Sequence, residues 1–387
     1  MVPALSQART SPFDRLPSEL LLDVFAHLPP PVISIGEGVP ASQHNTLFDL
    51  QLVYKRFHQL CTTLLWRDLE VDVMPDTRRR LQQAVDRFRA SPARAEGCRT
   101  LRLEALDWTF MPLDLIGGPG VFPNVERLEL FQAMPLSLDV VARLPRLRHL
   151  VLQYGELRPA RHSLVFPHLV SLHLSDVTLA AAPKGWKSIS LSKSVTPALR
   201  RLCLGLVHVE DSSVGVETGR AAVFSQELVE QLEQVSVGLE HGHLLCGRVL
   251  PVGSVRPDLP ILWHASLDLA LPPGQAGQPL SPVPITFLCV RPLASRAVAD
   301  PSFVLKQLGA LVARHLYLRL LLLPAELWSS LAGPPNSPTS SVARLFLKGC
   351  SKRGLEVKSY DPLRPLEGFV PPEFSAFLKE HAASRAV

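Results

Sequence analysis

The sequence predicts an α/β fold in which a small N-terminal helical domain precedes an irregular solenoid of short parallel strands with outer helices and loops. Three observations predict this fold. A short apolar phrase recurs from residue 98 onward at intervals of 21 to 33 residues. Segments with apolar residues at helical spacing lie between several of these phrases. Ahead of them, two helical apolar stripes within residues 16–71 are separated by a loop that begins with three prolines.

The N-terminal helices follow from residue spacing. In PSELLLDVFAHL (17–28) the apolar residues follow the helical period, and the prolines at 29–31 end the helix. After a loop to Thr46, residues 47–71 carry a second helical stripe. A helix of about eleven residues is not stable alone in water, so its apolar face must be covered. Two short helices cover one another only in part, which predicts that some apolar surface of this domain is left for another contact.

The recurring phrase fits an LxxLxL frame. It is clearest in CRTLRLEAL (98–106), VERLELFQA (125–133) and LVSLHLSDV (169–177). In LxL the two apolar side chains point to one face of a strand, and stacked repeats bury a face that a single repeat cannot. The predicted central apolar residues are Leu101, Leu128, Leu150, Leu172, Leu202, Val235, Leu267, Leu288, Leu316 and Leu345.

These elements predict a division of the chain. Outer-wall helices are expected at 76–91, 221–232 and 301–315, and a loop is expected at 271–284. The predicted order is a flexible N-terminus (1–11), a helical domain (12–70), a linking helix (71–97), a solenoid (98–353) and a C-terminal cap or tail (354–387). The remaining possibility is that the phrases are core strands of another α/β fold.

Composition and charge exclude several classes of partner. The net charge of +5 arises from 40 basic and 35 acidic residues without a long basic run, and aromatics make up 6%, so no nucleic-acid partner is expected. The most apolar window, 311–328, contains Arg314, His315, Arg319 and Pro324 and is too short to span a bilayer, so no membrane association is expected. Without a secretory signal or a CxxC pair, the six cysteines indicate reduced thiols in the cytoplasm or nucleus.

Catalytic motifs are absent from the sequence. It has no GxSxG, GxxxxGK[ST], GxGxxG or HExxH motif, so we expect no catalytic residues, no cofactor and no enzymatic activity. The closest approach to a metal site is the group His241, His243 and Cys246. A structural zinc site needs four ligands, so we expect no metal, and exposed loop histidines are the simpler explanation.

The N-terminal pattern resembles the F-box, the motif by which adaptor proteins dock on the Skp-type subunit of cullin-RING ubiquitin ligases. The series runs from LPxEL through LxxVYKRFxxL to LLWRDLEV, and the following segment resembles the leucine-rich repeats of fungal-type F-box adaptors. The chain departs from both families. Tyr54, Lys55, Arg56 and Phe57 stand where the F-box has Cys-Arg-x-Trp, and the loop from Pro29 to Thr46 is longer than usual.

The repeats depart from their family as well. Ala133, Gly155, Val177 and Val207 occupy the position that usually holds Asn or Cys, and only Cys350 fits it. The loss of this side chain, which normally bonds the turn backbone, predicts uneven repeats.

The resemblance implies a substrate adaptor of an SCF-type ubiquitin ligase that binds a Skp-type subunit and, through it, a cullin. The alternative is a scaffold in which the N-terminal helices only cap the solenoid. The adaptor requires the surface around Leu16, Pro17 and Leu20 to be exposed in the isolated chain. The positions implied to bind the Skp-type subunit are Leu16, Pro17, Glu19, Leu20, Phe25, Leu28, Val53, Phe57, Leu65 and Trp66.

The family also implies that a protein substrate lies on the concave face, which the outward residues of the strands form. One predicted row runs through Arg102, Glu129, Val151, His173, Cys203, Ser236, Asp268, Cys289, Tyr317 and Phe346. The next row ends in Arg291, Arg319 and Lys348. We therefore predict that Arg291, Tyr317, Arg319, Phe346 and Lys348 hold an acidic or phosphorylated segment. A different register in the weaker repeats would instead turn these residues into the core.

Overall fold

A computed structural model covers the 387-residue chain. It describes residues 12–28, 32–35, 46–73, 82–83, 86, 90, 96–105, 121–132, 135–160, 164–181, 189–210, 223–238, 249–250, 259–265, 285–291, 301–332, 338–361 and 370–385. The chain divides into two compact units, Met1–Leu147 and Arg148–Val387.

The first unit begins with three helices, α1 (Ser18–Ala26), α2 (Thr46–Val53) and α3 (Lys55–Leu65). The second predicted stripe is thus two helices, because Tyr54 between them is extended, with a φ of −154°. The three helices close on one apolar core. It consists of Leu21, Phe25, Leu47, Phe57, Cys61 and Leu65.

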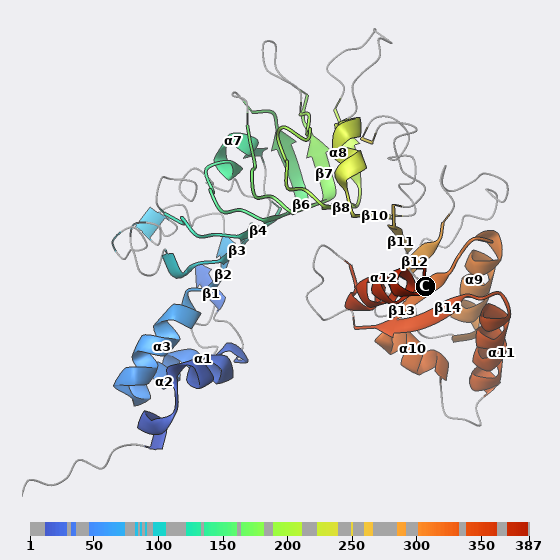
Figure 1. The fold of residues 1–387 in the computed structure, drawn as a ribbon, viewed down its shortest axis with the longest axis horizontal. Coiled ribbons are helices and arrows are strands. Elements are labelled where there is room, and N and C mark those ends of the chain that lie inside the picture. Colours follow the sequence, from blue (N-terminus) through green and yellow to red (C-terminus); the bar gives the residue numbers. More distant parts are fainter. Residues whose placement is uncertain are drawn as a thin grey trace, which may run out of the picture. The chain divides into compact units, whose positions relative to one another are not determined.

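The same unit holds a parallel ladder in chain order (Figure 1). Its strands are β1 (Val32–Ile35), β2 (Asp68–Val73), β3 (Thr100–Ala105) and β4 (Arg127–Phe131), followed by the short β5 (Leu136–Ser137) and α7 (Leu138–Val141). The ladder starts earlier than residue 98, as β1 lies inside the predicted loop and β2 includes the start of the predicted linking helix. Most of that helix and residues 1–11 lie outside the described residues.

The second unit is also α/β with a long parallel ladder. In chain order it contains β6 (His149–Arg158), β7 (Ser171–Leu179), β8 (Arg201–Leu204), β10 (Gln234–Gly238), β11 (Ile261–Ala265), β12 (Phe287–Val290), β13 (Leu320–Pro324) and β14 (Glu356–Tyr360), with β9 (Val207–Val209) beside β7. Its helices are α8 (Gln226–Gln231), α9 (Pro301–Arg314), α10 (Ala325–Ala332), α11 (Pro338–Lys352) and α12 (Pro372–Arg385). The predicted α/β class with a parallel sheet is confirmed, as is the helix expected at 301–315.

The register agrees with the predicted repeat frame in its clearest copies. Leu101 pairs with Leu128, and Leu150, Leu172, Leu202 and Val235 form one continuous row.

A backbone feature repeats with the same period. Gln132, Tyr154 and Asp176 have φ values of 57°, 53° and 53°, and each lies four residues after its central leucine. A positive φ is uncommon outside glycine, so three copies at one position show that these segments are structural repeats.

The last four predicted phrases, from residue 264 onward, do not keep that frame. Val235 pairs with Ile261 in β11, and Leu267 lies outside the described residues. Leu288 pairs with Trp263 and so lies in the row of Val237, two residues further along than predicted. Residues 313–321 end α9 and form a turn, so that the strand begins only at Leu320.

The phrase at 342–350 is wrong as a strand, because it lies in α11. Its inward residues are Ala343, Phe346, Leu347 and Cys350. Their spacing of three and four residues fits one face of a helix at least as well as it fits a strand.

The C-terminal segment is more than a cap on the last repeat. β14 pairs with β13 and extends the ladder beyond residue 353, and α12 then packs against one face of β11–β13 (Figure 1). The resulting core contains Leu262, Cys289, Leu320, Leu322, Tyr360, Val370, Phe374 and Phe377. β11 and β13 are consequently buried on both faces.

None of the helices in the described ranges is both long enough and apolar enough to cross a membrane.

Candidate functional site

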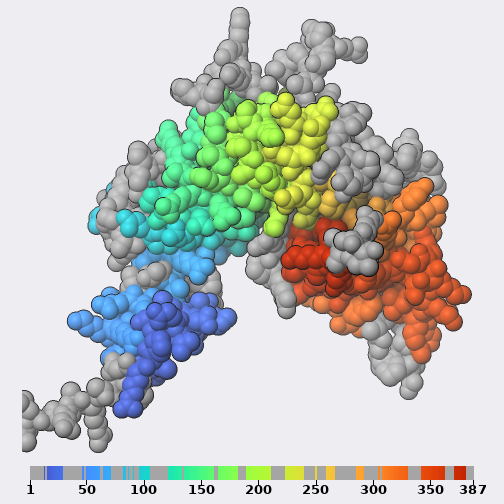
Figure 2. All heavy atoms as spheres, viewed as in Figure 1, coloured from blue at the N-terminus to red at the C-terminus, as the bar shows by residue number. Residues whose placement is uncertain are grey.

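The helical domain exposes apolar side chains that its own core does not use. Along α1, Leu21 and Phe25 face the core, whereas Leu20 and Val24 point away from it and are 55% and 61% exposed. Leu20 and Val24 are neighbours on one helix face because they are four residues apart. On α2, Leu52 and Val53 are 87% and 71% exposed. These residues, together with Leu16, form what we call the exposed apolar set, and α1 is at the surface in Figure 2.

Arg56 fixes the segment that precedes α1. Its guanidinium donates to the carbonyl oxygens of Phe13 at 2.8 Å and Leu16 at 2.6 Å, and to the Ser18 hydroxyl at 2.9 Å. Charge-assisted hydrogen bonds of this kind are stronger than neutral ones. Arg56 therefore ties the Leu16–Pro17 step to α3 and holds it in an exposed position, a role that the sequence pattern did not reveal.

The predicted Skp-type binding residues fall into two groups. Leu16, Pro17, Glu19, Leu20 and Val53 are exposed. The others support the domain from within: Phe25, Phe57 and Leu65 are buried in the helical core, and Leu28 and Trp66 pack against it. The prediction did not include Val24 and Leu52, whose exposure follows only from which side of each helix is buried.

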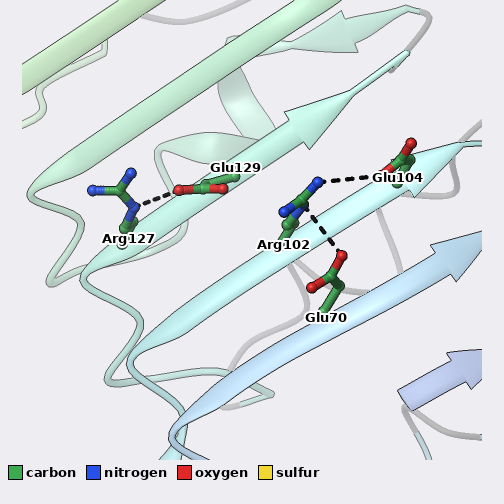
Figure 3. Close-up of polar contacts among 5 residues, drawn as sticks. All are labelled: Glu70, Arg102, Glu104, Arg127 and Glu129. Atoms are coloured by element: carbon green, nitrogen blue, oxygen red, sulfur yellow. Dashed lines mark hydrogen bonds and ion pairs between the residues drawn. The ribbon is translucent and has the colours of Figure 1, made fainter. Parts of the chain in front are cut away.

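One face of the first ladder carries paired charges (Figure 3). Arg102 on β3 lies 3.4 Å from the carboxylates of Glu70 on β2 and Glu104 on its own strand. Its guanidinium also lies over the Phe131 ring, 4.6 Å from the centroid.

A second pair lies on the neighbouring strand, where Arg127 and Glu129 of β4 form an ion pair. Arg102 and Glu129 are register partners, as predicted. Because these charges compensate one another, a partner would meet a polar but nearly neutral surface.

The corresponding predicted row in the second unit is buried. Val151, His173, Cys203 and Ser236 are register partners, as predicted. All four are nearly inaccessible, and burial raises the pKa of the Cys203 thiol to about 12. Ser236 Oγ lies 2.5 Å from Nε2 of His264, which is itself buried. This row therefore offers polar groups to the interior of the unit rather than to a ligand.

His264 should make the second unit sensitive to acid. Burial, with a smaller contribution from the positive charge of Arg291, lowers its pKa from 6.5 to about 3. Below about pH 6.5 the unfolded chain binds a proton that the folded chain does not, so stability is present above this pH and falls by about 1.4 kcal/mol per unit as the pH approaches 3. Urea unfolding should show a loss of about 1–2 kcal/mol between pH 7 and pH 5 from this group.

A non-titrating variant isolates this effect. His264→Gln should show a shallower pH dependence than the unchanged chain over the same range. Since the pKa of His315 is also lowered by burial, some acid sensitivity should persist in the variant. An identical slope in both proteins would mean that His264 does not contribute.

The predicted substrate residues do not form a row on the strand face. Arg291 is partly buried just after β12, where its backbone N–H donates to the Ala265 carbonyl at 2.8 Å. Tyr317 and Arg319 are exposed in the turn before β13, and Phe346 and Lys348 lie on α11. The prediction of a strand row is wrong, because the strand begins only at Leu320 and the segment at 338–352 is helical.

The three possible zinc ligands, His241, His243 and Cys246, lie outside the described residues. Within the described ranges, no three His, Cys, Asp or Glu side chains are grouped so that they could hold a metal ion.

No model of a known protein family matches the chain, and no curated protein matches it either.

Proposed function

We propose that this protein is a substrate adaptor of an SCF-type cullin-RING ubiquitin ligase. Its F-box-like helical domain docks on a Skp-type subunit and, through it, on a cullin, and its leucine-rich-repeat-like ladder holds a protein substrate. Ubiquitin transfer would depend on the proximity that the partners provide, with no catalytic residue or cofactor from this chain. The setting would be the cytoplasm or the nucleus, which fits the free thiols of the five described cysteines.

The observation that carries this proposal is the exposure of the Leu16, Pro17 and Leu20 segment. The adaptor requires this segment to be accessible, and it is exposed, as are Val24 and Val53. Large apolar side chains that remain exposed on a small domain often mark a protein interface. Arg56 adds support, because a fixed Leu-Pro step loses less conformational freedom when it binds.

The second candidate function is the scaffold, and a separate observation favours it. β1 arises from the segment between α1 and α2 and pairs with β2 at the outer edge of the ladder. Covering the edge of a sheet is what a terminal cap does in a repeat protein. The scaffold alternative would use the N-terminal helices for this purpose alone.

Binding of the full-length chain to a purified Skp-type subunit separates the two functions. Leu20→Asp and Val53→Asp should each weaken binding about tenfold or more, because a charge would be buried against an apolar partner. Leu20 lies in the first turn of α1, where an added carboxylate favours the helix, so the variant should fold. Isothermal titration calorimetry would give the affinities.

Val165→Asp is the matched control, because Val165 is an exposed apolar residue in the second unit. Its affinity should equal that of the unchanged chain. If the folded, unchanged chain does not bind the Skp-type subunit, the adaptor proposal fails and the scaffold takes its place.

A further inference from the structure

One segment of the second unit has a surplus of basic residues. Residues 301–352, from the start of α9 to the end of α11, contain six of the 40 basic residues and one of the 35 acidic residues. The segment therefore has a net charge of +5.

The fold brings the C-terminal ends of α9 and α11, which both carry basic residues, together. β13 and β14 are neighbouring parallel strands, so the residues that lead into them lie at one edge of the sheet, where the Glu356 N–H donates to the Arg319 carbonyl at 2.9 Å. Arg353 donates to the carbonyl oxygens of Val312 at 2.9 Å and His315 at 3.3 Å. These bonds hold the end of α11 against the end of α9, and the two helices lie side by side in Figure 1.

Exposed basic and apolar side chains alternate around this junction. Leu316 is 76% exposed and Leu345 is 69% exposed. In the part of the chain that the structure describes, Arg314, Arg319 and Lys348 form no ion pair, whereas Arg102, Arg127 and Arg158 on the strands each have a carboxylate within 4 Å. We call this region the α9–α11 surface. It comprises Arg314, Leu316, Tyr317, Arg319, Leu345, Lys348 and Lys352.

Helix stability explains only part of this composition. Arg314 and Lys352 lie in the last turns of their helices, where a positive charge is favourable. Lys348 lies one turn earlier and repels Lys352, since like charges four residues apart destabilise a helix. The exposed Leu316 and Leu345 side chains also gain nothing from contact with water. A partner that neutralises the lysines and covers these leucines would remove both the charge repulsion and the apolar exposure.

We propose that the α9–α11 surface binds an acidic protein segment whose carboxylates alternate with apolar side chains. The carboxylates would pair with Arg319 and Lys348, and the apolar side chains would contact Leu316 and Leu345. As a substrate surface it rests on the adaptor function proposed above, and it deepens that function by assigning the class of substrate. Duplex DNA would leave the leucines uncovered.

The probe is a short fluorescein-labelled peptide of Glu with Leu at every fourth position, titrated against the full-length chain and followed by anisotropy. The double variant Arg319→Glu/Lys348→Glu should bind about tenfold more weakly or worse, because two attractive contacts become repulsive. Arg146→Glu/Lys193→Glu makes the same change in net charge at exposed positions elsewhere and should bind within about twofold of the unchanged chain.

Several results would overturn the proposal. They are an equal loss in the control variant, equal binding of a peptide with Gln in place of Glu, and tighter binding of a DNA duplex or of phosphatidylserine vesicles. Binding of the Skp-type subunit, measured on the same variants, should be unchanged. If the unchanged chain binds the peptide but not the Skp-type subunit, the acidic-segment site stands and only its role in substrate delivery is lost.

Discussion

Replacement of Phe57 by alanine is expected to unfold the helical domain and leave the second unit folded. Phe57 is 4% exposed, and its ring meets those of Phe13, Phe25 and Tyr54 edge-on at centroid distances of 5.2, 5.2 and 5.3 Å. Removing a buried phenylalanine costs about 3–5 kcal/mol, which is comparable to the stability of a whole small domain. Hydrogen exchange measured by mass spectrometry should show loss of protection in α1–α3.

Two further variants give this experiment its controls. Leu52→Ala truncates a side chain that is 87% exposed and should change stability by no more than about 0.5 kcal/mol. Phe57→Leu keeps most of the buried volume, so it should preserve both the fold and the binding of a Skp-type subunit if Phe57 acts only through the core. Full protection of α1–α3 in Phe57→Ala would show that this aromatic cluster does not hold the domain together.

The helices and the first strands were predictable because their residues follow one period. In TLRL (100–103) and RLEL (127–130) the apolar residues alternate, which fits a strand with one buried face, and Leu101 and Leu128 are partners in β3 and β4. Leu21, Phe25 and Leu28, which are spaced by four and then three residues, likewise fit one face of a helix. Where two periods fit one segment, as at Ala343–Cys350, the pattern does not decide, and the predicted strand is a helix.

The burial of β13 on both faces could not be predicted, for a different reason. LLLLP in β13 is apolar at every position because both of its faces are buried, so it has no alternation to fix its register. The cover on one of those faces is α12, which begins 48 residues after the end of β13. The exposed residues of the helical domain share this limitation, because Leu20 and Leu21 are chemically alike and only the packing of α3 decides which one is buried.

Phe374→Ala should release α12 from the ladder, because the ring of Phe374 is part of the core between them. Phe374 is fully buried, and its ring meets that of Phe287 at 5.2 Å, while Phe377 meets the same ring at 5.8 Å. The loss of about 3–5 kcal/mol should raise the population of the open form by about two to nearly four orders of magnitude. Cys289 reports this opening, since it is 1% exposed and burial raises its pKa to about 12.

Labelling of Cys289 by a thiol reagent, identified by mass spectrometry, should therefore accelerate by a similar factor. Lys379→Ala changes an exposed residue of the same helix and should leave the rate unchanged. Equal labelling of the unchanged chain and Phe374→Ala would show that α12 does not protect this face.

The position of α12 also bears on where a substrate can bind. While α12 stays in place, the strand face of β11–β13 is closed, and the proposed binding of an acidic segment to the α9–α11 surface does not require that face. If Phe374→Ala instead gained peptide binding that did not depend on Arg319 and Lys348, the strand face would be the binding site and α12 its competitor.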